Sequence, residues 1–237
     1  MIRAIRYVAS VGVLTLWYAS KPVFAALAGV RHKPGGVYDR AGRDWGRAVL
    51  RWNRIAVQVE GRDHLVAGRA AVYIANHASF VDILAMLAEL PGSVRFVYKK
   101  GMNRIPLLGL AMRRSRHIAI DRKNKAAAFA VYEEAAAAIR EGMSAVLFAE
   151  GTRCRDGRLQ PFRKGAFLLA LAARVPVVPV LCVNTFETLP RGSLSPRPGT
   201  VTLRIGEPIP TDGMQPGDRE ELARRTRAAL VAMGARE

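Results

Sequence analysis

The sequence predicts a single α/β domain, with a largely parallel or mixed sheet flanked by helices. An apolar, membrane-anchoring helical segment is predicted to precede it. Short apolar runs alternate with helix-length segments along the chain, which is typical of this fold class. Charged residues recur just past the ends of those runs, where α/β sheets gather their sites. A length of 237 residues with 50% hydrophobic content is enough for one domain with a full core.

The predicted helices and strands follow from the period of the apolar residues. The stretch 38–54 repeats its apolar residues at helical spacing, whereas 55–59 alternates like a strand. Gly, Pro and short polar clusters separate the later elements. The predicted strands are 55–59, 70–75, 94–98, 117–120, 144–148, 175–183 and 201–205. The predicted helices are 38–54, 83–90, a short one from 105, and then 123–140, 165–173 and 217–233.

The N-terminal thirty residues contain two apolar pieces. The uncharged run 7–20 would span about 21 Å as a helix, short of a ~30 Å hydrocarbon core, and Lys21-Pro22 separates it from 23–30. A signal peptide and one tilted span running through Lys21 and Pro22 are two interpretations. We favour the third, in which two short helices dip into one leaflet. Further Arg and Lys residues follow, which suits an anionic lipid surface.

The net charge points to anionic partners. Lys and Arg number 37 against 19 acidic residues, giving +18. Nucleic acid, a lipid surface or a phosphorylated substrate would each fit such a surplus. Nucleic acid is not expected, because aromatics are only 7% and there is no zinc-ligand spacing or nucleic-acid motif. Cys154 and Cys182 are too few for a disulfide framework or a metal cluster, so we expect no metal and no cofactor.

One stretch combines a histidine and an aspartate at a predicted strand-to-helix turn. His77 follows the strand 70–75, and Asp82 precedes the helix 83–90. A carboxylate on one imidazole nitrogen leaves the other nitrogen as an acceptor, which is the arrangement of a general base. A turn histidine beside a helix-capping aspartate fits the pair alone equally well. Ser79 is a poor candidate for a triad nucleophile, since it lies only two residues from the histidine.

Cationic residues that follow neighbouring predicted strands favour the interpretation of His77 as a general base over that of a structural turn histidine. They could surround a phosphate, and Gly151 and Thr152 leave room for backbone N–H groups to approach an anion. Neither GxxxxGK[ST] nor G-x-S-x-G is present, so a P-loop and an α/β-hydrolase elbow are excluded. With no nucleophile on the protein, the substrate must bring its own hydroxyl. The cations are Lys99, Lys100, Arg122, Arg153 and Lys164.

The blocks Asn76-His77-x4-Asp82 and Phe148-Ala149-Glu150-Gly151-Thr152-Arg153 resemble the signatures of the glycerolipid acyltransferases, most closely the 1-acyl-sn-glycerol-3-phosphate acyltransferase type. Ile118–Arg122, Phe162–Gly165 and the proline-containing strand 175–180 are also similar to this family. The blocks occur in the family's order over about residues 70–183. Ala149, Ala119-Ile120 and Cys154 depart from the usual residues of the family.

The resemblance implies a role for each block. His77 would deprotonate the acceptor hydroxyl, and Asp82 would orient it. The remaining residues would bind the lysophospholipid, with Arg153 on its phosphate; they are Glu150, Gly151, Thr152, Arg153, Arg122, Lys99, Lys100 and Lys164. The resemblance also implies a membrane-anchoring segment at 1–33, an acyltransferase domain at 34–237, and a place on the cytoplasmic face of the inner membrane.

The expected reaction is transfer of a fatty acyl group from acyl-CoA or acyl-carrier protein to lysophosphatidate, forming phosphatidate. Another lysolipid, such as lyso-ornithine lipid, is an alternative acceptor. A non-catalytic basic protein that binds membranes or nucleic acid is the alternative from another class.

Overall fold

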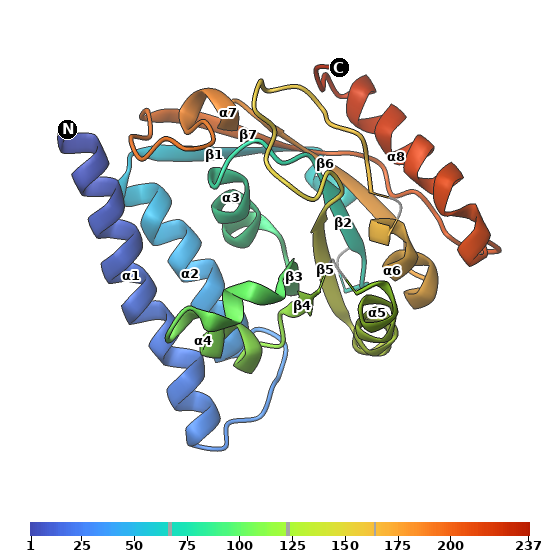
Figure 1. The fold of residues 1–237 in the computed structure, drawn as a ribbon, viewed down its shortest axis with the longest axis horizontal. Helices are drawn as coiled ribbons and strands as arrows, with labels where there is room; N and C mark the ends of the chain where they lie inside the picture. The colour runs from blue at the N-terminus through green and yellow to red at the C-terminus, as the bar shows by residue number, and fades with distance from the viewer. Residues whose placement is uncertain (66–67, 122–123, 164) are drawn as a thin grey trace.

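The computed structural model describes residues 1–65, 68–121, 124–163 and 165–237, and within them seven strands form one sheet between two layers of helices (Figure 1). Helices α1–α4 lie on one side of the view, and α5, α6 and α8 lie on the other. This three-layer arrangement confirms the predicted α/β domain.

The sheet has the order β1-β7-β6-β2-β5-β3-β4 and is mixed. Only the β6–β7 pair is antiparallel among the described strands; the other neighbours are parallel. The largely parallel sheet predicted from the sequence is therefore confirmed. The strands are β1 (Ile55–Glu60), β2 (Val72–Ala75), β3 (Ser93–Lys99), β4 (Ile118–Ile120), β5 (Met143–Phe148), β6 (Val177–Val183) and β7 (Gly199–Ile205).

The helices agree with the sequence prediction to within a few residues, except at the N-terminus. A short helix at 185–188 and the 3-10 turns are additions, since segments of three or four residues carry no period to detect. The helices are α1 (Ile2–Leu27), α2 (Val37–Trp52), α3 (Val81–Glu89), α4 (Leu108–Arg114), α5 (Lys125–Arg140), α6 (Gly165–Ala173), α7 (Thr185–Thr188) and α8 (Arg219–Ala232). The 3-10 turns are Arg62–His64, Lys100–Arg104 and Pro216–Asp218.

Strand β2 lies at the centre of the sheet and is buried on both faces. Its side chains alternate, so Tyr73 joins the core beneath α1–α3, and Ile74 joins the core beneath α5 and α6. A strand buried on both faces reads as an unbroken apolar run, which is why β2 was visible in the sequence.

The prediction of two short N-terminal helices is wrong. The structure has one continuous helix, α1, which runs through Lys21 and Pro22. A proline inside a helix removes one hydrogen bond and typically costs ~3 kcal/mol. Pro22 is buried, and α1 packs along α2 and α4, so tertiary packing offsets that cost. By length and composition alone, α1 is also long and apolar enough to cross a membrane.

A buried ion pair fastens α2 to the sheet. Arg95 on β3 lies 2.7 Å from Asp39 on α2, and both side chains are almost fully buried. The same carboxylate accepts hydrogen bonds from the Gly35 N–H and the Ser93 hydroxyl. Removing one partner of a buried pair leaves an uncompensated charge in a medium of low dielectric constant.

We expect Arg95→Met to lower the free energy of unfolding by about 3–5 kcal/mol, because the Asp39 carboxylate would remain buried without its cation. Urea unfolding in detergent measures this change. The double variant Arg95→Met/Asp39→Asn should lose less than the sum of the two single variants. Arg224→Met, which breaks an exposed pair with Glu221, is the control and should unfold like the parent. Additive losses in the double variant would contradict the coupling.

Candidate active site

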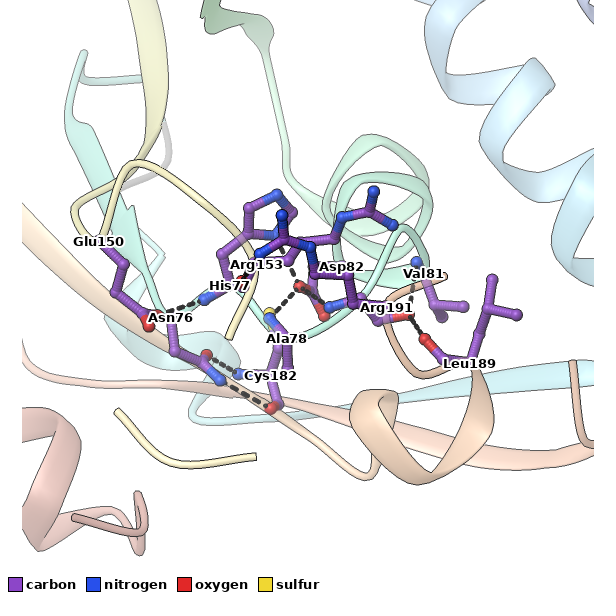
Figure 2. A network of polar contacts seen from close by, with 11 residues as sticks. Asn76, His77, Ala78, Val81, Asp82, Glu150, Arg153, Cys182, Leu189 and Arg191 are labelled. Atoms are coloured by element: carbon purple, nitrogen blue, oxygen red, sulfur yellow. Dashed lines mark hydrogen bonds and ion pairs between the residues drawn. The ribbon is translucent and has the colours of Figure 1, made fainter. Parts of the chain in front are cut away.

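The pairing of β2 with β5 places two loops next to each other. Ala75 is opposite Phe148 in the register of these parallel strands, so both strands end at the same level. The loop after β2 carries His77, and the loop after β5 carries Glu150 and Arg153 (Figure 2). The carboxyl edge of a parallel sheet is where α/β folds place their sites.

His77 and Asp82 form the hydrogen-bonded pair that their spacing predicts. The imidazole Nδ1 lies 2.9 Å from Asp82 Oδ2, and the carboxylate is completely buried (Figure 2). Asp82 stands in the first turn of α3, where its charge meets exposed backbone N–H groups. With Nδ1 held as a donor, Nε2 of His77 is the acceptor nitrogen. This is the geometry of an oriented general base.

The same oxygen of Asp82 also fixes the turn itself. Oδ2 accepts the backbone N–H groups of Ala78 and Ser79, each at 2.8 Å. Its other oxygen, Oδ1, is buried and has no hydrogen-bond partner among the described residues. The negative charge of Asp82 is therefore balanced chiefly through Oδ2, and it would stabilise an imidazolium on His77.

Two further contacts hold the histidine in place. The His77 ring stacks on Phe148 with the ring centroids 3.9 Å apart and the planes 15° from parallel. Asn76 exchanges hydrogen bonds with the backbone of Cys182 on β6, at 2.7 and 3.2 Å. The ring and the backbone that leads into it are thus fixed from β5 and from β6.

Ser79 has a structural role, as its position in the turn predicts. Its hydroxyl donates to the carbonyl of Leu189 at 2.8 Å and accepts the N–H of Val81 at 3.1 Å. A buried hydroxyl committed to two partners is not placed to attack a substrate.

Glu150 contacts the His77–Asp82 turn from the neighbouring loop. Its Oε1 accepts the His77 N–H at 2.6 Å, and its Oε2 accepts the Gln160 N–H at 3.0 Å. Only 3% of the residue is exposed. Burial raises the pKa of the Glu150 carboxyl to about 7, although the two backbone N–H groups oppose that shift. The carboxylate clamps the two loops together.

A cavity of about 1120 Å³ opens in front of His77. Its walls are mostly apolar and come from α1, α2, α4, β3 and α6. Cationic side chains line it as well: Lys99 at the end of β3, Arg153 beside the histidine (Figure 2), and Arg163 just before α6. An apolar cavity with a base and a few cations suits a ligand that has a hydrocarbon chain and an anionic group.

Of the six expected binding residues that the structure describes, four lie together at the cavity. Lys99, Gly151, Thr152 and Arg153 line the cavity with His77. Of the described residues that were expected there, Lys100 and Glu150 do not reach it; Lys100 is exposed, and Glu150 faces the two amides. Arg122 and Lys164 lie outside the described residues.

Sequence reasoning missed three residues of this site. Arg163 lines the cavity and could have been found, because it adjoins Lys164 in a basic pair. Arg219, at the start of α8, lines the cavity too, but it follows no strand and so gave no signal. Phe148 was predicted as the last residue of a strand and the first of a signature block, but not as a site residue, because its stacking on His77 depends on the register of β2 and β5.

Several relatives with known names are similar to this chain in sequence. A 1-acyl-sn-glycerol-3-phosphate acyltransferase of Limnanthes douglasii is 39% identical over 159 residues, which cover 67% of this chain and 56% of the relative. One from Limnanthes alba is 36% identical over 184 residues, covering 77% and 64%. The human alpha form is 32% identical over 180 residues, covering 76% and 64%. The chain thus spans less than two thirds of the length of these relatives.

A solved structure has the same fold. The 1-acyl-sn-glycerophosphate acyltransferase PlsC from Thermotoga maritima matches with a TM-score of 0.76 and 23% sequence identity, over 100% of this chain and 96% of that one. The model of the acyltransferase family matches residues 56–183, more than half of the chain, and this range holds both the His77–Asp82 turn and the Glu150–Arg153 loop. The chain therefore belongs to the acyltransferase family.

Proposed function

We propose that this protein transfers a fatty acyl group from a thioester donor, acyl-CoA or acyl-carrier protein, to the free hydroxyl of lysophosphatidate, forming phosphatidate. The observation that carries the proposal is the oriented His77–Asp82 pair at the wall of an apolar cavity that also contains Arg153. Relatives that are named for this reaction support the choice of acceptor.

In the proposed mechanism, Nε2 of His77 takes the proton of the acceptor hydroxyl. The alkoxide oxygen forms a bond to the thioester carbonyl carbon, and Asp82 stabilises the imidazolium. The tetrahedral intermediate then collapses, the carbon–sulfur bond breaks, and its electron pair leaves with the sulfur. The imidazolium returns its proton to that thiolate. No covalent intermediate on the protein is needed.

We assign the acceptor phosphate to Arg153 and Lys99, which line the cavity with His77. A guanidinium suits bidentate phosphate contact, and Gly151 and Thr152 offer close backbone approach beside it. Lys100 does not line the cavity, so in this proposal it adds to the positive field outside it. The phosphate roles of Arg122 and Lys164 rest on the family resemblance alone. Glu150 becomes a residue that positions the loop rather than one that binds the lipid.

We further propose that residues 1–33 attach the protein to the cytoplasmic leaflet of the inner membrane. One face of α1 packs on the domain through Tyr7, Val11 and Leu14. The other face exposes large apolar side chains, which would bury themselves in an anionic lipid surface. Those more than half exposed are Ile2, Ile5, Val8, Val13, Leu16, Trp17, Phe24 and Leu27.

His77→Ala should reduce acyl transfer by about 10²–10⁴-fold, because the general base is lost. The assay supplies lysophosphatidate with acyl-CoA or acyl-carrier protein to the purified protein. The circular dichroism spectrum and the Tm should stay close to those of the parent. A folded variant with a near-normal rate would disprove the mechanism.

Arg153→Ala should raise KM for lysophosphatidate about tenfold or more, because a charged hydrogen bond to phosphate is lost. The KM for a lysolipid with no phosphate, such as lyso-ornithine lipid, should not change with the same substitution. Arg155→Ala is the matched control, since Arg155 lies on the same loop and is exposed. A fall in kcat alone, with KM unchanged, would remove Arg153 from the phosphate site.

The pH dependence should report on Glu150. Its pKa of about 7 in the folded state lies above its ordinary value of 4.5, so the folded protein binds a proton that the unfolded chain has lost. This contribution to stability is therefore full below pH 4.5 and is lost as the pH rises through about 7. Activity should change in the opposite direction, since only the carboxylate accepts both amides.

Glu150→Gln should remove this titration. We expect its free energy of unfolding to fall less than that of the parent between pH 4.5 and about 7. Acyl transfer above pH 7 should fall about tenfold, because the amide group of glutamine cannot accept from both N–H groups. Unfolding and rate measurements across this range check both effects, and an unchanged pH profile would contradict the clamp.

A further inference from the structure

Arg227 on α8 links the C-terminal helix to the active site, although it lies outside the family's signature blocks. Its Nη1 donates to the carbonyl oxygen of Gln160 at 3.2 Å. The guanidinium carbon lies 5.7 Å from the centroid of the Phe162 ring. The Nη2 and Nε atoms lie 3.0 and 3.1 Å from Glu237 Oε1, with which they form an ion pair. About a third of the side chain is exposed.

The Gln160 residue is held from two opposite sides. Its carbonyl oxygen accepts from Arg227, and its N–H donates to Glu150 Oε2 at 3.0 Å. Glu150 Oε1 in turn accepts the N–H of His77 at 2.6 Å, and the His77 carbonyl accepts the N–H of Cys154 at 2.8 Å. A continuous series of hydrogen bonds therefore runs from α8 to the backbone of the catalytic histidine.

We propose that Arg227 is a positioning residue: it holds the Gln160 segment against Glu150 and thereby fixes the backbone that carries His77. The inference rests on the proposed function and deepens it. Arg227 touches no substrate, since it does not line the cavity within the described part of the chain. Its effect passes through the geometry of Glu150 and through the charge that it places nearby.

The charges facing Glu150 make this role measurable. Asp82 on α3 raises the pKa of Glu150, and Arg227 on α8 lowers it, in addition to the larger effects of burial and of the His77 and Gln160 amides. Removing the positive charge of Arg227 should therefore raise the pKa of Glu150 further. The pH below which acyl transfer declines should move upward with it.

The experiment compares Arg227→Met with Arg224→Met in the full-length protein. Arg224 lies on the same helix and has the same charge, but it pairs only with Glu221 at the surface. For Arg227→Met we expect kcat to fall about tenfold with KM changed by less than about twofold, since a displaced base slows chemistry more than binding. The acidic limb of its kcat–pH profile, where kcat declines as the pH falls, should shift to higher pH. Arg224→Met should behave like the parent.

Two conservative variants sharpen the test. Arg227→Lys keeps the charge and a donor and should restore the acidic limb of the parent. Arg227→Gln keeps a donor without the charge, so it should show the shifted limb even if Arg227→Met does not fold. The proposal would be overturned if Arg227→Met or Arg227→Gln had the same kcat, and the same acidic limb in its kcat–pH profile, as Arg224→Met.

Hydrogen–deuterium exchange gives a readout that does not need activity. In Arg227→Met, the amides of His77 and Gln160 should exchange faster than in the parent and in Arg224→Met, because their common acceptor is less well fixed. If the parent transfers no acyl group, the proposed function fails while the exchange comparison still decides the role of Arg227. If the parent is active and exchange is equal in all three proteins, only the role of Arg227 fails.

Discussion

The site depends on the buried carboxylate of Asp82. One oxygen accepts three donors, the imidazole of His77 and the amides of Ala78 and Ser79, so the same atom shapes the turn and orients the base. Burying a charge is costly unless it is paired and hydrogen-bonded. The pairing would therefore couple folding to the proposed chemistry, because the turn that stabilises the carboxylate also places His77 in the wall of the cavity.

A second buried carboxylate joins this turn to the rest of the sheet. Glu150 accepts an amide of its own loop, from Gln160, and the His77 amide of the loop after β2, which the β2–β5 register brings within reach. Burial raises its pKa to about 7, because the two amides only partly offset the loss of water. Its proposed role in positioning explains why a glutamate stands beside residues that would bind an anion, where a direct contact would repel the ligand.

Most of the fold could be predicted from the sequence, because the spacing of apolar residues and the Gly, Pro and polar residues that end each segment are local features. It also predicted the His77–Asp82 pair, since both residues lie in one turn. Other features depend on contacts between distant segments and leave no local pattern. The continuity of α1 through Pro22 depends on packing against α2 and α4. The hydrogen bond from Gln160 to Glu150 depends on how the loop after β5 folds back on itself. The hydrogen bond from Arg227 to Gln160 depends on how α8 packs against that loop.

The position of His77 also accounts for the kind of substrate proposed. The imidazole lines the same cavity as apolar side chains from α1, α2 and α4 and the cations Lys99 and Arg153. A ligand with a hydrocarbon chain and a phosphate can contact both the apolar walls and the cations. A purely polar ligand would leave the apolar walls without a partner, and a purely apolar one would leave the cations without one. Since α1 forms a wall of this cavity and also exposes an apolar face, the proposed membrane anchor would place the site where a lipid substrate arrives.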